Sequence, residues 1–210
     1  RFEVLRWIAD YKLGAHREFV HAGLRRGDGN YGLFRAYVAC IDSLDGRKNP
    51  DRTNIQLARE LMKAPDTPER LHAHLIRYLA GQKHAYSTAQ LIEWSRSTNA
   101  TLQREAIWSL RFQDDEASQA HLGKLAADAS QPVDVRLAAT AALGETETLL
   151  TLAGGENKAL RDEALRSLIG VPLGTEATST LTEAANRHPN SAPLVKRALG
   201  QPFTKINRPV

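Results

Sequence analysis

The 210-residue sequence has a single cysteine, few aromatic residues and no long apolar run. One thiol cannot form a disulfide within the chain, so the core must be stable without covalent cross-links. Cys40 lies in the apolar run from Tyr37 to Ile41, which predicts a buried structural thiol, because a reactive cysteine needs a cationic, partly open site. No stretch approaches the roughly 20 apolar residues that cross a bilayer, and none has the form of a signal peptide. We therefore expect no membrane span.

The sequence also lacks several residue spacings of common catalytic and metal sites. Among seven histidines no His-x-x-x-His pair occurs, and His72 and His74, two residues apart, point to different faces of a helix. No serine stands in a Gly-x-Ser-x-Gly turn. The acidic run 114–116 stands where a helix should begin, which predicts a helix cap. We expect a non-catalytic chain that holds neither a metal nor a cofactor.

Six times, a short run of small and aliphatic residues ends on a branched apolar residue, here called the closing residue. Successive closing residues are 33, 38, 31, 33 and 25 positions apart. Recurrence at such intervals is typical of stacked helix pairs, in which each pair buries its apolar face only against its neighbours. The closing residues are Ile8, Ile41, Leu79, Leu110, Leu143 and Leu168.

In the three best copies, an alanine lies four residues before the closing residue, and another apolar residue lies four before the alanine. This spacing places the three side chains on one helical stripe, and the alanine lets a neighbouring helix approach closely. Seven residues before the closing residue, a polar side chain recurs beside the stripe: Gln103, Arg136 or Arg161. The stripes are Leu102, Ala106 and Leu110; Val135, Ala139 and Leu143; and Leu160, Ala164 and Leu168.

These patterns predict an all-α fold, an α–α superhelix of about six helix pairs over residues 1–200, with a linker over residues 201–210. No segment alternates as a strand would, so we expect no sheet. Residues 1–8 match the second helix of a pair whose first helix is missing, so we expect a segment of a longer protein. Helices are predicted over residues 1–13, 15–26, 30–44, 53–63, 67–80, 87–97, 100–112, 115–128, 131–143, 145–153, 157–169, 175–188 and 191–199.

The capping and turn residues between these predicted helices favour helical hairpins. Ser87 and Gln90 predict a capping box, and the polar stretch 45–51 predicts a surface loop. Glycines follow four of the apolar stripes, where a left-handed C-terminal cap is expected. These glycines are Gly14, Gly81, Gly144 and Gly170.

A modest excess of basic residues offers one hint of function. Lysine and arginine number 28 against 24 acidic residues, and Arg6, Arg77 and Arg166 each stand two residues before a closing residue. Such a row could line a concave face and bind a partner or phosphates. The alternative is that these arginines pair with carboxylates of the adjoining helix pair.

The three tryptophans lie within apolar helical patterns, so we expect them to pack in the core rather than to stack on bases. They are Trp7, Trp94 and Trp108. With no long basic run, we do not expect nucleic acid to be the partner.

Two segments carry a resemblance to known repeats. Residues 132–144 and 159–168 resemble HEAT-type helical repeats. Together with residues 1–8 and with 184–189 running on to 199–203, they resemble the helical-repeat region of large exported bacterial haem-binding proteins. In that family a propeller domain similar to sugar dehydrogenases precedes the repeats, and a cytochrome c domain with a Cys-x-x-Cys-His motif follows. The resemblance implies a spacer or docking module and a periplasmic or cell-surface location. Because this sequence has no Cys-x-x-Cys-His, no haem ligand can be assigned to it.

We therefore predict a non-catalytic scaffold that holds flanking domains or a partner protein, with Arg6, Arg77 and Arg166 as candidate binding residues. The alternative is a nucleic-acid-binding domain or a HEAT-like DNA glycosylase with a basic concave face. A glycosylase needs an aromatic cleft and a carboxylate, for which Trp94 with Glu93, or Trp108 with Glu105, are the candidates. A chromophore lyase built on similar repeats is a third possibility.

Overall fold

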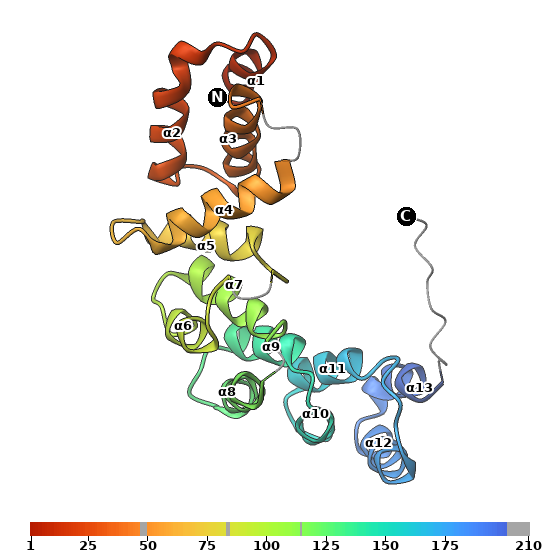
Figure 1. The fold of residues 1–210 in the computed structure, drawn as a ribbon. Helices are drawn as coiled ribbons and strands as arrows, with labels where there is room; N and C mark the ends of the chain where they lie inside the picture. Colours follow the sequence, from red (N-terminus) through yellow and green to blue (C-terminus); the bar gives the residue numbers. More distant parts are fainter. Residues whose placement is uncertain (47–49, 83–84, 114, 201–210) are drawn as a thin grey trace. The chain divides into compact units, whose positions relative to one another are not determined.

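The computed structural model describes residues 1–46, 50–82, 85–113 and 115–200, and for residues 50–54 the backbone alone. These residues form an all-α structure of 13 α-helices and two short 3₁₀ helices (Figure 1), and no strand occurs among them. The prediction of an all-α fold is confirmed. The predicted linker over residues 201–210 lies outside the described residues.

The chain forms two compact units, one up to Phe112 and one from Gln113. The first unit contains α1 (Phe2–Asp10), η1 (Gly14–His16), α2 (Arg17–Arg26), α3 (Tyr31–Leu44), α4 (Pro50–Lys63), α5 (Glu69–Tyr78), α6 (Thr88–Trp94) and α7 (Ala100–Leu110). The second unit contains α8 (Glu116–Ala127), α9 (Val133–Ala142), α10 (Thr146–Ala153), α11 (Lys158–Ser167), α12 (Thr175–Arg187), η2 (Pro189–Ser191) and α13 (Ala192–Gly200).

All 13 predicted helices are present, with ends that differ by a few residues. The largest difference at a helix start is at α4, which begins at Pro50 rather than at residue 53 and so takes in the end of the predicted loop. Proline is well suited to a first helical turn, because its missing N–H would have no partner there. Residues 47–49 of that loop lie outside the described residues.

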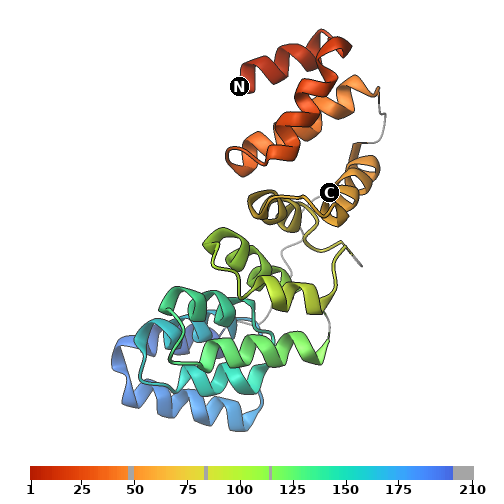
Figure 2. The ribbon, with the colours of Figure 1, turned by 90° about the vertical axis from the view of Figure 1, so that its left-hand side faces the viewer.

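Within each unit, consecutive helices pack as pairs. In the first unit α2 packs on α3, α4 on α5 and α6 on α7; in the second, α8 packs on α9, α10 on α11 and α12 on α13. We call the earlier member of each pair its first helix and the later member its second helix. Figures 1 and 2 show the second unit as two rows, with α8, α10 and α12 in one and α9, α11 and α13 in the other. In the first unit, α1 packs on α3 as α5 packs on α7.

Five second helices share one frame around the closing residue. Each begins after an N-cap residue that lies eleven positions before the closing residue, although the intervals between closing residues vary. Three of these caps are asparagines, whose side-chain oxygens accept backbone N–H bonds that the first turn leaves open. The N-caps are Asn30, Pro68, Asn99, Pro132 and Asn157.

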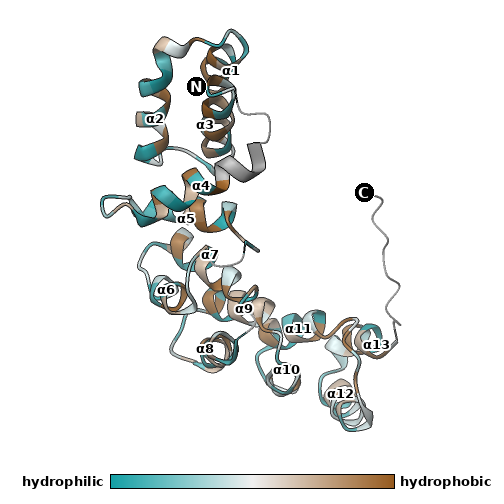
Figure 3. Cartoon of the chain, in the orientation of Figure 1, coloured by the Kyte–Doolittle hydropathy of each residue, from teal (hydrophilic) through white to brown (hydrophobic). Residues whose placement is uncertain are grey.

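The predicted alanine stripe is the buried seam of these helices. Ala106, Ala139 and Ala164 are each 0% exposed, and every closing residue is buried. Figure 3 shows the resulting contrast in the first pair, where α3 is brown along most of its length and α2 is largely teal. The second helices therefore carry much of the apolar core.

The predicted caps are confirmed in part. Ser87 and Gln90 form the capping box, and Asp115 caps α8 by accepting the N–H of Ser118 at 2.7 Å. Gly81 and Gly170 have the expected positive φ angles of 78° and 84°.

The prediction is wrong for Gly14 and Gly144, which do not have a positive φ. After α1 the positive φ falls on Lys12 instead, and Gly14 opens a 3₁₀ turn. Gly144 donates its N–H to Gln119 Oε1 at 2.8 Å, so a side chain of α8 replaces the expected backbone cap.

Candidate interaction surface

The three candidate arginines all lie at the solvent-exposed edge of their helices, and each has a carboxylate partner. Arg6 Nε lies 3.4 Å from Asp10 Oδ2 on its own helix, and an Arg166 guanidinium nitrogen lies 2.7 Å from Glu163 Oε2 on α11. Arg77 reaches from α5 to Glu105 of α7, at 4.0 Å. Exposed pairs such as those of Arg6 and Arg166 contribute about 0–1 kcal/mol, whereas the Glu105 side chain that faces Arg77 is only 13% exposed. Arg6 and Arg77 belong to the first unit and Arg166 to the second.

Arg77 is part of an aromatic cluster on α3 and α5. Its guanidinium carbon lies 4.3 Å from the centre of the Tyr31 ring. The Phe34 ring lies 5.8 Å from Tyr31, 5.5 Å from His74 and 5.6 Å from Tyr78, measured between ring centres. Phe34 is buried at the centre of the cluster, and the half-buried Tyr31, His74 and Tyr78 surround it beside the solvent-exposed Arg77.

The charges beside this cluster are mostly basic. Burial raises the pKa of Glu105, and the neighbouring guanidinium groups of Arg77 and Arg104 oppose that rise. Burial also raises the pKa of Tyr31, again opposed by nearby arginines, Arg35 and Arg77. One half-buried carboxylate therefore lies among three guanidinium groups.

The expectation that all three tryptophans pack in the core is wrong for two of them. Trp7 is 60% exposed and Trp108 is 41% exposed, while Trp94 is half-buried and stacks on His72 at 5.4 Å. Trp108 stands two residues before its closing residue, the position of Arg77, and that correspondence could have predicted its exposure. The Arg111 guanidinium carbon lies 4.4 Å from the Trp108 ring centre.

The polar position seven residues before the closing residue has a single role in four second helices. Its side chain donates to a backbone carbonyl at or just beyond the end of the first helix of the same pair. His72 donates to Met62, Gln103 Nε2 to Ser95 at 3.0 Å, and Arg136 Nε to Ala126 at 3.0 Å. Arg161 donates to Gly155 at 2.8 Å and to Glu156 at 3.2 Å. These carbonyls have no partner within their own helix, so the bonds tie the two helices together.

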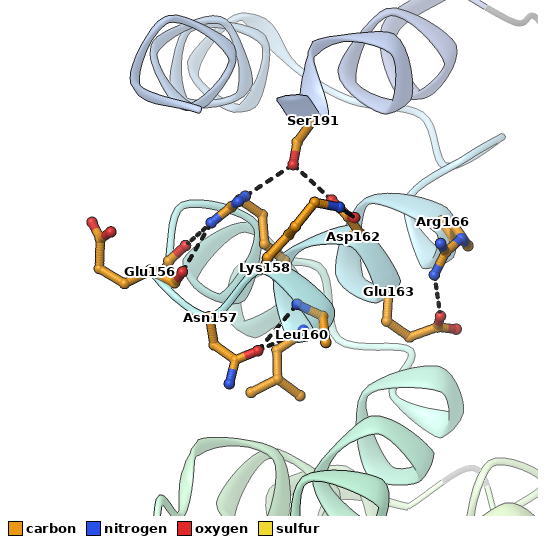
Figure 4. A network of polar contacts seen from close by, with 11 residues as sticks. Glu156, Asn157, Lys158, Leu160, Asp162, Glu163, Arg166 and Ser191 are labelled. Atoms are coloured by element: carbon orange, nitrogen blue, oxygen red, sulfur yellow. Dashed lines mark hydrogen bonds and ion pairs between the residues drawn. The ribbon is translucent and has the colours of Figure 1, made fainter. Parts of the chain in front are cut away.

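Arg161 also belongs to a buried hydrogen-bond network, whose other members Lys158, Asp162 and Ser191 are labelled in Figure 4. Arg161 Nε donates to Ser191 Oγ at 3.0 Å, and Ser191 Oγ donates to Asp162 Oδ1 at 2.6 Å. Lys158 is paired with the second oxygen of Asp162. Burial tends to raise the pKa of Asp162, but the bonds from Lys158 and Ser191 outweigh it, and the pKa lies below its ordinary value. The network joins α11 to η2 and is structural.

Among the residues that the structure describes, no group of three or more His, Cys, Asp or Glu side chains could hold a metal ion. Two Glu-x-x-His spacings occur, Glu18 with His21 and Glu69 with His72, yet no cluster of three potential ligands exists in the described ranges. Cys40 is buried and burial raises its pKa, which agrees with a structural thiol.

Neither glycosylase candidate lines a described hollow. Two surface hollows near the end of α4 are lined by residues that include neither Trp94 nor Trp108. Within the described ranges, no helix is long and apolar enough to cross a membrane.

We expect the thermal stability of the first unit to fall as the pH is lowered from 7.5 to 5.5. Burial lowers the pKa of His72 and of His74 below the ordinary 6.5, so the unfolded chain binds protons more tightly than the folded one. The stability from these neutral rings is present above pH 6.5 and is lost as the pH falls below it. Melting followed by tryptophan emission measures the effect, because all three tryptophans lie in this unit. In the double variant His72→Gln/His74→Gln the melting temperature should depend less steeply on pH. An unchanged dependence would contradict the role given to these two histidines.

Comparison with known proteins adds no assignment. No family model, curated protein or solved structure matches the chain.

Proposed function

We propose that this chain is a non-catalytic, HEAT-like helical-repeat scaffold of about six helix pairs, which binds a partner protein or flanking domains on the exposed side of its second helices. The observation that carries the proposal is the shared frame of five successive second helices, from the N-cap to the closing residue eleven positions later. Equivalent polar side chains also tie the two helices of four pairs together. Arrays of this kind present extended surfaces while each unit is stabilised locally.

The resemblance to exported haem-binding proteins extends the proposal to the parent protein and its location. In that setting the chain is a spacer within a redox protein of the periplasm or cell surface, and its partner is a neighbouring domain or an associated protein. The aromatic cluster supports a role in polypeptide binding, because the Tyr31, His74 and Tyr78 rings are half-buried and the Arg77 guanidinium group lies over the Tyr31 ring.

The test compares an arginine double variant with a matched control. Arg77→Glu/Arg166→Glu is expected to reduce recovery of the partner at least about tenfold, because each charge is reversed at an exposed binding position. Helix content should stay close to the wild type, since both arginine side chains are exposed. Arg77 faces the half-buried Glu105 at 4.0 Å, so Arg77→Gln in place of Arg77→Glu separates loss of binding from repulsion between two carboxylates. The measurement is affinity isolation of the tagged chain from its native cells, with circular dichroism for folding.

The control variant is Arg25→Glu/Lys124→Glu, which makes the same change of net charge at exposed positions of first helices, one in each unit. It should recover the same partner as the wild type. If the arginine variant recovers that partner equally well, or if both variants lose folding, these residues are not the binding surface. Binding of a 20-base oligonucleotide at low salt, lost as salt rises, would favour the nucleic-acid alternative.

A further inference from the structure

Helix α1 is apolar on two sides, and one of them faces solvent. Leu5 and Ile8 are buried on the side of α3. On another side Val4, Trp7 and Tyr11, spaced three and four residues apart, are 46%, 60% and 74% exposed. Such a stripe of large apolar side chains marks an interaction site more often than a solvated helix face.

Two of the exposed positions of α1, those of Val4 and Trp7, are buried in all or most of the later second helices. Val4 stands four residues before its closing residue, and in the next five second helices the residue at that position is at most 4% exposed. Trp7 stands one residue before it, and in α3, α7 and α9 that position is also buried. The buried equivalents of Val4 are Tyr37, Leu75, Ala106, Ala139 and Ala164, and those of Trp7 are Cys40, Ser109 and Ala142.

The adjacent pair shows what covers this position. The Tyr37 ring lies against Gly23 of α2, so closely that a Cβ on Gly23 would lie 2.5 Å from Tyr37 Cε1. The position is therefore covered by the first helix of the same pair. Because a short turn joins α2 to α3, that first helix runs antiparallel to the second.

Arg1 adds a second, independent observation. It stands seven residues before Ile8, the position from which His72, Gln103, Arg136 and Arg161 bind carbonyls at the end of a first helix. Within the described residues, no first helix lies on α1 to offer such carbonyls. The exposed stripe of α1 and the side chain of Arg1 thus both match positions that, in the other second helices, contact a first helix.

We infer that the Val4, Trp7 and Tyr11 face of α1 is a docking site for an amphipathic helix from outside residues 1–210, packed antiparallel to α1 in the place of a first helix. The occupant has an apolar stripe with a small residue opposite Val4, and its last carbonyls accept from Arg1. A second copy of this chain suits the site less well, because its α1 would present another Trp7 and Tyr11 rather than small residues. The inference rests on the proposed helical-repeat scaffold and names one of its binding surfaces.

The experiment places a known first helix on this face. A copy of residues 145–160, which contains α10 and its following turn, is appended directly before Arg1 of the full chain. In the native chain this segment precedes Arg161, the equivalent of Arg1, so the copy enters in the same register. Trp7 emission, measured with Trp94→Phe and Trp108→Phe, should shift to shorter wavelength. Amide exchange of residues 2–10 should slow about tenfold or more.

The matched control carries the same appended copy with Leu149→Lys and Ala153→Lys, which are the buried residues of α10. It should leave Trp7 emission and α1 exchange as in the original chain. The inference is overturned if the unmodified copy also leaves both unchanged in a folded chain. It is equally overturned if light scattering finds the original chain to be a dimer that Trp7→Glu dissociates, which assigns the face to a second copy. Neither outcome depends on Arg77 or Arg166. Failure of this inference can therefore be distinguished from failure of the partner-binding test.

Discussion

Replacement of Arg161 by methionine is expected to lower the free energy of unfolding by about 3 kcal/mol. Arg161 is almost fully buried, and its guanidinium group makes three hydrogen bonds, two to backbone carbonyls and one to Ser191. Methionine fills much of the space but donates nothing, so the carbonyls of Gly155 and Glu156 lose their side-chain donor. Urea unfolding followed by circular dichroism at 222 nm measures the loss.

The control for this variant is Arg166→Met on the same helix. Arg166 is exposed and pairs only with Glu163, so its replacement should cost less than about 1 kcal/mol. Equal losses for the two variants would mean that the network around Ser191 contributes no more than an exposed ion pair.

Replacement of the closing residue Leu79 by alanine is expected to cost about 2–5 kcal/mol. Leu79 has no exposed surface and lies where α5 ends against the first unit's core. Truncation removes apolar contacts and leaves a cavity that fixed helices cannot fully collapse. Chemical unfolding followed by tryptophan emission reports on this unit.

Leu13→Ala provides the comparison, because Leu13 is the same residue type in the same unit but is 40% exposed. Its replacement should cost less than about 1 kcal/mol. If Leu79→Ala lowers the free energy of unfolding no more than Leu13→Ala does, the repeated pattern does not identify buried residues.

The helices and their buried stripes could be predicted from the sequence because a helix imposes a fixed period on the side chains that it buries. The same period places Ala106, Ala139 and Ala164 on one seam, and all three are buried. A period does not say whether a neighbour covers a second apolar side, which is why Trp7 and Trp108 were wrongly expected in the core.

The role of the position seven residues before the closing residue could be predicted less fully. The recurrence of Gln103, Arg136 and Arg161 is visible in the sequence, but their acceptors are backbone carbonyls, which no residue type identifies. His72 was missed because its ring differs chemically from an amide or a guanidinium group. Ser191, thirty residues from Arg161, could not be connected to it without the structure.

In five second helices the distance from N-cap to closing residue is constant, whereas the intervals between successive closing residues vary. The chain therefore has segments of fixed length and segments of variable length. Length changes between neighbours must fall outside the eleven-residue segments, in the first helices and the turns. Peptide tags or reporter loops are therefore best inserted in the turn before the first helix α12, since the spacing from N-cap to closing residue would remain unaltered.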